Sequence, residues 1–339
     1  TFHAGARRTW SDTDFSGCMQ DRDGNYASGI TVITRRLNPS APAAQPQGCV
    51  TFMPDATAGR PFVGSLDQSN TSWRVGLDWK PMRGTLLYAT LSKGYKSGSF
   101  PNINATTFAS FQPVTQESVL AYELGFKTDL GSRAIQLNGA VFYYDYRDKQ
   151  FRARIVDAVG VFGAVEALVN VPKSRVKGAE LSATLQPLDG LRINAGVTYL
   201  DTEVTKDFFN FDPFGARANF KGEAFPFTPK WSLQGDANYE WGISDKLNAF
   251  IGGNVSYRTS TTSAFGRYAP APLYPYSLVE ISGYALVDTQ IGIAASDGQW
   301  RAALWVKNIT NKYYWTDAFR QHNWRQPSKK GIHAIGAID

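Results

Sequence analysis

The sequence has no long apolar run, few charged residues, three histidines and two cysteines. No stretch of 18 or more apolar residues occurs, so we expect no transmembrane helix. Charged residues make up 19% of the chain, and the basic ones are scattered, which argues against binding to nucleic acid. The histidines are His3, His322 and His333, and the sequence carries no G-x-S-x-G, HExxH or CxxC motif. We therefore predict that the chain is not an enzyme and has no cofactor or metal centre, and we treat His322 as an ordinary loop residue.

Aromatic residues are plentiful, at 14% of the chain, and apolar side chains alternate with polar ones over long stretches. In LSATLQPLDGLRINAGVTYLDTE, residues 181–203, Leu191, Ile193 and Val197 share one parity, whereas Arg192 and Asn194 share the other. A period of two predicts β-strands, because successive side chains of a strand point to opposite faces. A strand of a soluble sandwich needs only about five or six residues, and these strands are roughly twice as long.

The same unit recurs as five hairpins, each closed by a short turn rich in glycine, proline or aspartate. The hairpins lie at 72–94, 118–146, 179–203, 230–258 and 284–308. With an opening strand and a weak closing one at 331–339, we expect about twelve strands. Long segments separate them, at 11–71, 95–117, 147–173, 204–229, 259–283 and 309–330. Short turns on one side and long extracellular loops on the other are typical of outer-membrane β-barrels.

The alternation also separates uncharged from charged side chains. A charge at the bilayer midplane costs about 2–4 kcal/mol, so an uncharged parity suits contact with lipid. The opposite parity holds the charges, which are Arg74, Asp78, Glu123, Lys127, Glu180, Arg192, Asp236, Glu240, Arg258, Asp288, Arg301 and Lys307. We expect Asp236 and Glu240 to line a solvated wall rather than to act as a catalytic pair.

Tryptophans begin and end several of the predicted strands. Trp231 and Trp241 lie ten residues apart, which spans roughly 25 Å of membrane for a tilted strand. We predict an aromatic girdle of Trp73, Trp79, Trp231, Trp241 and Trp300. The predicted fold is all-β, a transmembrane antiparallel up-and-down barrel. A soluble β-sandwich is the alternative, but it leaves the strand length and the one-sided loops unexplained.

Several segments resemble TonB-dependent outer-membrane receptors. LLYATLSKGYKSGSFPN (86–102) and SVLAYELGFKTDLGSRAIQLNGAVFYYDYRDKQ (118–150) are similar to stretches of that family. SRVKGAELSATLQPLDGLRINAGVTYLDTE, PFTPKWSLQGDANYEW and ALWVKNITNKYYWTDA continue the match in order, so that it covers about residues 72–317. The resemblance implies a plugged barrel of about 22 strands. We expect residues 1–339 to be the C-terminal half of that barrel, with a long extracellular loop at 11–71, no plug domain and no TonB box.

Closure of the barrel has two possible forms. An open sheet edge cannot face hydrocarbon, because each unsatisfied backbone group costs several kcal/mol. Further strands therefore complete the barrel, which we favour, or the strands present close by themselves into a narrower one. Pairing between 1–10 and 331–339 would indicate the second form.

The resemblance implies active import into a Gram-negative bacterium across its outer membrane, driven by the TonB–ExbB–ExbD complex. A ferric siderophore is the favoured cargo; a carbohydrate, cobalamin, or passive flow through a channel without a plug are the alternatives. Outer-membrane lipid would be a further partner. The candidate ligand contacts are aromatic and basic residues of predicted loops, for which packing in a loop or girdle is the competing role. They are Tyr95, Lys96, Tyr313, Tyr314, Trp315, Arg320, Trp324 and Arg325.

Both cysteines, Cys18 and Cys49, lie in the first long segment. A loop exposed outside the cell is in an oxidising environment. We therefore predict a Cys18–Cys49 disulfide, with two free thiols as the alternative.

Overall fold

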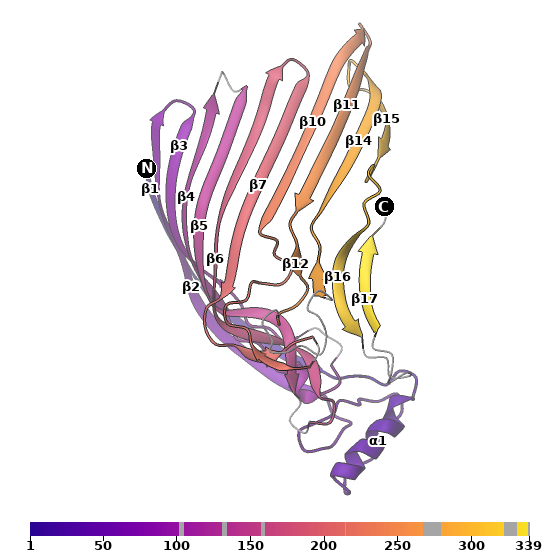
Figure 1. Cartoon of the computed structure of the whole chain (residues 1–339). Coiled ribbons are helices and arrows are strands. Elements are labelled where there is room, and N and C mark those ends of the chain that lie inside the picture. The colour runs from indigo at the N-terminus through magenta and orange to yellow at the C-terminus, as the bar shows by residue number, and fades with distance from the viewer. Residues whose placement is uncertain are drawn as a thin grey trace.

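A single curved antiparallel sheet dominates the computed structural model, which describes residues 1–101, 105–130, 134–156, 160–213, 215–266, 279–321 and 331–337 (Figure 1). The sheet has eleven strands, each paired with its neighbours in chain order. The strands are β1 (Phe2–Gly17), β2 (Phe62–Met82), β3 (Thr85–Lys96), β4 (Glu117–Leu130), β5 (Ile135–Val156), β6 (Ala164–Leu188), β7 (Leu191–Val204), β10 (Trp231–Ser244), β11 (Leu247–Arg258), β14 (Tyr284–Ala295) and β15 (Arg301–Val306). The predicted all-β, up-and-down topology is confirmed.

Smaller elements lie outside this sheet. Among the described residues, the strands β16 (Tyr314–Gln321) and β17 (Gly331–Ala337) pair only with each other. Two short ribbons join β8 (Phe209–Phe211) to β9 (Arg217–Asn219) and β12 (Thr261–Thr262) to β13 (Glu280–Ile281). The helices are α1 (Tyr26–Leu37) and the 3-10 turn η1 (Phe108–Phe111). Among the residues that the structure describes, no helix combines the length and apolar character needed to cross a membrane.

Several strands extend beyond their predicted ends. The first connection is 18–61 rather than 11–71, because β1 continues to Gly17 and β2 begins at Phe62. The predicted loop 147–173 is mostly strand, and the predicted loop 309–330 contains β16. In these extensions both sides of the sheet carry polar residues. An apolar–polar alternation therefore marks only the part of a strand with one apolar face, and the sequence pattern ended too early.

The register assigns all strands to two faces. One row of directly opposed residues crosses the sheet from β2 to β10 without a charge: Leu77, Ala89, Leu124, Val141, Ala179, Tyr199 and Trp231. The adjacent row, on the other face, is Asp78, Tyr88, Gly125, Ala140, Glu180, Thr198, Ser232, Arg258 and Tyr284. We call the face of the first row the apolar face and that of the second row the polar face.

The described sheet is open. Its edges are β1 and β15, and within the described residues β1 pairs only with β2, whereas β17 pairs with β16. The pairing of 1–10 with 331–339 that would close a narrow barrel is therefore not found among the described residues.

The two ends of the sheet differ. Figure 1 shows short turns at the upper end and the long connections, including α1, gathered at the lower end. Two aromatic clusters hold the long connections together. Phe62 and Phe111 are buried with Phe15, Phe100 and Phe108 packed around them, and Phe220, Phe225 and Phe265 form a second core with Phe208. These clusters give the loop end a packed interior of its own.

The turn Asp189–Gly190 offers a test of the packing at the short-turn end. Gly190 has φ +76°, and a Cβ there would lie 2.0 Å from the Glu240 carbonyl oxygen. Gly298 has φ +75° in an equivalent turn, but open space surrounds it. We expect Gly298→Ala to cost about 1–2 kcal/mol of folding free energy from the left-handed backbone alone. Gly190→Ala should cost more, since β10 must also shift. Denaturant unfolding in detergent micelles measures both; equal losses would contradict the predicted clash.

Candidate functional site

The polar face borders a cavity of about 720 Å³ that runs from β3 to β14. Tyr88, Lys127 and Glu180 line one part of it, and Arg258 and Tyr284 line the part nearest the long connections. Each strand contributes alternate side chains, because residues i and i+2 share a face. The cavity therefore offers charges of both signs, hydroxyls and rings to a polar ligand.

Toward the short turns, two carboxylates of the polar face have partners within the chain. Glu240 lies 3.5 Å from the Arg301 guanidinium and accepts a hydrogen bond of 3.0 Å from Asn248. Asp236 accepts hydrogen bonds of 3.0 and 3.3 Å from Asn194 and Asn238. These contacts fit a polar wall in which each carboxylate has its own partners.

At the loop end of the cavity, a cation lies over one aromatic ring, which in turn contacts a second ring. The Arg258 guanidinium carbon lies 4.4 Å from the centroid of the Tyr284 ring, and that ring lies 4.3 Å from the ring of Tyr314 on β16. Arg258 also donates a hydrogen bond of 3.5 Å to the Trp315 carbonyl oxygen, whereas its buried Nε has no hydrogen-bond partner among the described residues. An arginine held against rings can pair with an anion and stack on a planar ligand. We call Arg258, Tyr284 and Tyr314 the stacked site.

A second cavity, of about 530 Å³, lies within the connections at the loop end. Phenylalanines 151, 220, 227 and 265 line it together with Arg152 and Arg154. Arg154 donates a hydrogen bond of 3.1 Å to the Pro213 carbonyl oxygen, and Arg152 is exposed. Asp317 of β16 also lines this cavity, three residues after Tyr314. The strand β16 therefore runs from the stacked site to the second cavity.

The predicted ligand contacts fall into separate groups. Tyr314 and Trp315 lie at the stacked site, although on a strand rather than in the predicted loop, and Tyr313 is exposed just before β16. Arg320 belongs to β16, but its side chain lies outside the described structure, as do His322, Trp324 and Arg325.

Tyr95 and Lys96 end β3, and six strands of the sheet separate them from β14. Tyr95 has the parity of the apolar face and lies 5.5 Å from the Lys93 amine, whereas Lys96 is exposed. The structure therefore does not bring Tyr95 and Lys96 to the stacked site. Sequence reasoning missed the ligand role open to Arg258, even though its charge on the polar parity at a strand end was visible.

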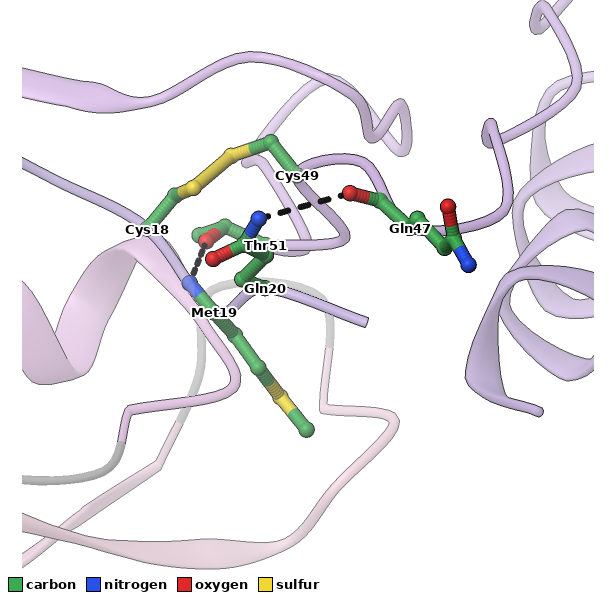
Figure 2. The surroundings of a disulfide bond; sticks show 6 residues. All are labelled: Cys18, Met19, Gln20, Gln47, Cys49 and Thr51. Atoms are coloured by element: carbon green, nitrogen blue, oxygen red, sulfur yellow. Dashed lines mark hydrogen bonds between the residues drawn. A yellow bond between two sulfur atoms is a disulfide. The ribbon is translucent and has the colours of Figure 1, made fainter. Parts of the chain in front are cut away.

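The first long connection is cross-linked at its base, where Cys18 and Cys49 form a disulfide (Figure 2). Beside the disulfide, the backbone N–H of Met19 donates a hydrogen bond of 2.8 Å to Thr51 Oγ1. The side-chain amide of Gln20 donates one of 3.4 Å to the backbone carbonyl of Gln47. The cross-linked segment carries α1, whose Ala27 and Ile30 are buried. The disulfide thus ties a helical subdomain to the end of β1.

Two loop carboxylates have a lowered pKa. A hydrogen bond from Thr57 Oγ1 (2.6 Å) and the nearby Arg60 guanidinium hold the pKa of Asp55 below its ordinary value. A hydrogen bond from Asn219 and the charge of Lys221 lower the pKa of Asp207. Both groups stabilise their turns above the unfolded-state pKa, and that contribution is lost as the pH falls through the folded-state pKa.

Comparison with known proteins identifies the family. The description "TonB dependent receptor-like, beta-barrel" matches residues 1–309. This chain is a TonB-dependent receptor barrel. A curated relative, the probable TonB-dependent siderophore receptor PiuA of Acinetobacter baumannii, is 22% identical over 268 residues, which cover 77% of this chain and 33% of PiuA.

Solved receptor structures share the fold. The ferric yersiniabactin uptake receptor FyuA of Yersinia pestis aligns with a TM-score of 0.59 at 16% identity, covering 82% of this chain and 37% of FyuA. The ferric-catecholate import receptor Fiu of E. coli K12 aligns with a TM-score of 0.57 at 16% identity, covering 93% of this chain and 38% of Fiu. The receptor barrel described here thus spans little more than a third of the length of these relatives. The family consists of transport receptors in the outer membrane, not enzymes.

Proposed function

We propose that this receptor barrel belongs to an importer of a ferric siderophore, with the stacked site as part of the ligand path. Siderophores that bind iron through catecholates are anionic and carry aromatic rings. A guanidinium that lies over an aromatic ring suits both properties, because it supplies charge and a stacking plane. The names of PiuA, FyuA and Fiu agree with this cargo. The arrangement of Arg258, Tyr284 and Tyr314 is the observation on which the proposal depends.

In this proposal the apolar face contacts the lipid of the outer membrane. The tryptophans proposed for the girdle all have its parity, and Trp79, Trp231, Trp241 and Trp300 are exposed, whereas Trp73 is half-buried. The rest of the receptor would supply the other strands, a plug and the segment that engages the TonB–ExbB–ExbD complex. The polar face would then line the interior in which the plug moves.

The test is binding of a ferric tris-catecholate complex to the purified complete receptor, measured by the quenching of tryptophan fluorescence. Arg258→Gln should weaken binding about tenfold, since it removes a charge worth roughly 1.4 kcal/mol. Arg192→Gln, on the same face near the short turns, is the matched control and should bind within twofold of wild type. Equal affinity of Arg258→Gln and wild type would contradict the role of the stacked site.

Other cargoes and a passive channel would give different results in such measurements. Binding of a glycan or cobalamin in place of the ferric complex would favour those cargoes. Conductance separates active import from passive flow, because a plugged receptor in a planar bilayer stays nearly silent. A steady open-pore conductance in the absence of TonB would point to a passive channel.

A further inference from the structure

Beyond its apolar band, the apolar face becomes basic. In the register, the rows past Leu91, Tyr122 and Tyr143 on the loop side contain Lys93, Ser118 and Arg147, on β3, β4 and β5. Neighbouring β6 adds basic residues of the same parity, which are Lys173, Arg175 and Lys177. Because directly opposed residues share a face, all these side chains project from the side of the sheet that carries the apolar band.

Three of these cations are already paired. Lys173 lies 3.5 Å from Asp145, Lys177 lies 2.9 Å from Asp201, and Arg175 pairs with Glu203. In the register rows that contain these ion pairs, β5, β6 and β7 carry no other carboxylate. The acidic residues of this patch are thus engaged with β6, which leaves the cations of β3 and β5.

Among the described residues, no carboxylate lies within ion-pair distance of Lys93 or Arg147, although Asp145 in the register row of Lys93 is near enough to act on the Lys93 charge. The Lys93 amine donates a hydrogen bond of 3.1 Å to Ser118 Oγ, and Ser118 stands directly opposite Arg147 in the register. Arg147 is exposed. Two cations therefore flank one hydroxyl on three adjacent strands, about 4.8 Å apart from strand to strand. Two positively charged donors and a hydroxyl can together donate hydrogen bonds to the oxygens of a phosphate group.

The height of this group on the sheet indicates its ligand. Tyr122 and Tyr143 lie directly opposite each other, with ring centroids 6.3 Å apart, and are two residues closer to the short turns than Leu120 and Asp145. Tyrosine rings gather where the acyl chains of a bilayer meet the headgroups. The rows immediately beyond them are at the level of the headgroup phosphates.

We propose that Lys93, Ser118 and Arg147 form a binding site for the phosphate of an anionic lipid in the outer leaflet. This inference rests on the proposed placement of the apolar face in the membrane. Electrostatic attraction and charge-assisted hydrogen bonds from the two cations hold the phosphate, while the acyl chains lie along the apolar face below. The site is separate from the polar face and from the stacked site.

The test measures binding of the complete receptor to mixed micelles that contain lipid A, a bisphosphorylated glycolipid, by isothermal titration calorimetry. Lys93→Gln/Arg147→Gln should bind about 30-fold more weakly, at roughly fivefold for each charge removed. Arg74→Gln/Arg192→Gln removes the same charge from the polar face and should stay within twofold of wild type. Unchanged heat-modifiable migration on gels shows that each variant is folded.

Two further arms identify the ligand. Dephosphorylated lipid A should bind wild type as weakly as lipid A binds the double variant. Inorganic phosphate at about 10 mM, an ordinary buffer concentration, should not displace lipid A. Equal binding of both lipids, equal loss in both variants, or full affinity in Lys93→Gln/Arg147→Gln would each overturn the site. Binding of the ferric complex is measured in parallel. Its absence from wild type would remove the cargo assignment and leave the lipid site standing.

Discussion

Arginine in place of Val255 should destabilise the protein folded in a bilayer by about 2–4 kcal/mol, the cost of a cation near the bilayer midplane. Val255 lies on the apolar face of β11 between Gly235 and Val287, and 44% of its side chain is exposed. Gly235 is on β10, close to the midpoint between Trp231 and Trp241. With lipid on the apolar face as proposed, an arginine at 255 would have no water around it, and the two residues directly opposite it, Gly235 and Val287, are not acidic.

The matched control is Asn254→Arg, one residue away on the polar face. Asn254 stands opposite Asp236 and Asp288, so a cation there meets two carboxylates. We expect a change within about 0.5 kcal/mol, as for other tolerated surface substitutions. Urea-dependent folding of the complete receptor into phosphatidylcholine vesicles gives both values. Similar losses for the two variants, or a tolerated arginine at 255, would show that lipid does not cover the apolar face.

Removal of the Cys18–Cys49 disulfide should destabilise the cross-linked segment by about 3–4 kcal/mol, the loop-closure entropy of a loop of that length. The two cysteines are 31 residues apart. The backbone hydrogen bond from Val50 to the Met19 carbonyl and the small core around Ile30 would remain. That core is too small to hold α1 in place alone.

Hydrogen exchange of the Cys18→Ser/Cys49→Ser variant measures this effect locally. Amides of α1 should exchange about 100-fold faster or more, in line with the lost free energy. Amides of β11 serve as the internal control and should exchange at the wild-type rate, because the sheet does not depend on the cross-link. Wild-type protein with a reductant should reproduce the variant. Slow exchange in α1 without the disulfide would mean that packing alone orders the segment.

The strands and their faces could be predicted from sequence because lipid-facing positions obey a strict rule. Leu191, Ile193 and Val197 share one parity in the sequence, and the register places them on the apolar face, opposite Tyr239, Ala237 and Leu233. This rule no longer applies where both faces of a strand carry polar residues, because the apolar–polar alternation is lost there. Gly17 and Phe62 were therefore placed in a loop, although they are opposed residues of β1 and β2.

The candidate site was harder to predict, because it depends on contacts between distant segments. Tyr314 could be singled out as an aromatic residue of a late segment, but its stacking partner Tyr284 is brought to it by β16, which the sequence did not reveal. Tyr95 and Lys96 have the same composition signal and lie elsewhere on the sheet. Residue type alone does not distinguish these cases; their position in the register does.

In the proposed membrane placement, the length of β6 sets how far the wall of the barrel extends beyond the membrane. This strand has 25 residues, and Lys177 lies beside Tyr143 at the edge of the apolar band. The 14 residues from Ala164 to Lys177 would then extend the wall by roughly 30 Å along the membrane normal at the usual strand tilt. If the apolar face lies in the outer membrane as proposed, the mouth of the receptor would open well above the headgroups, among the sugars of the cell surface.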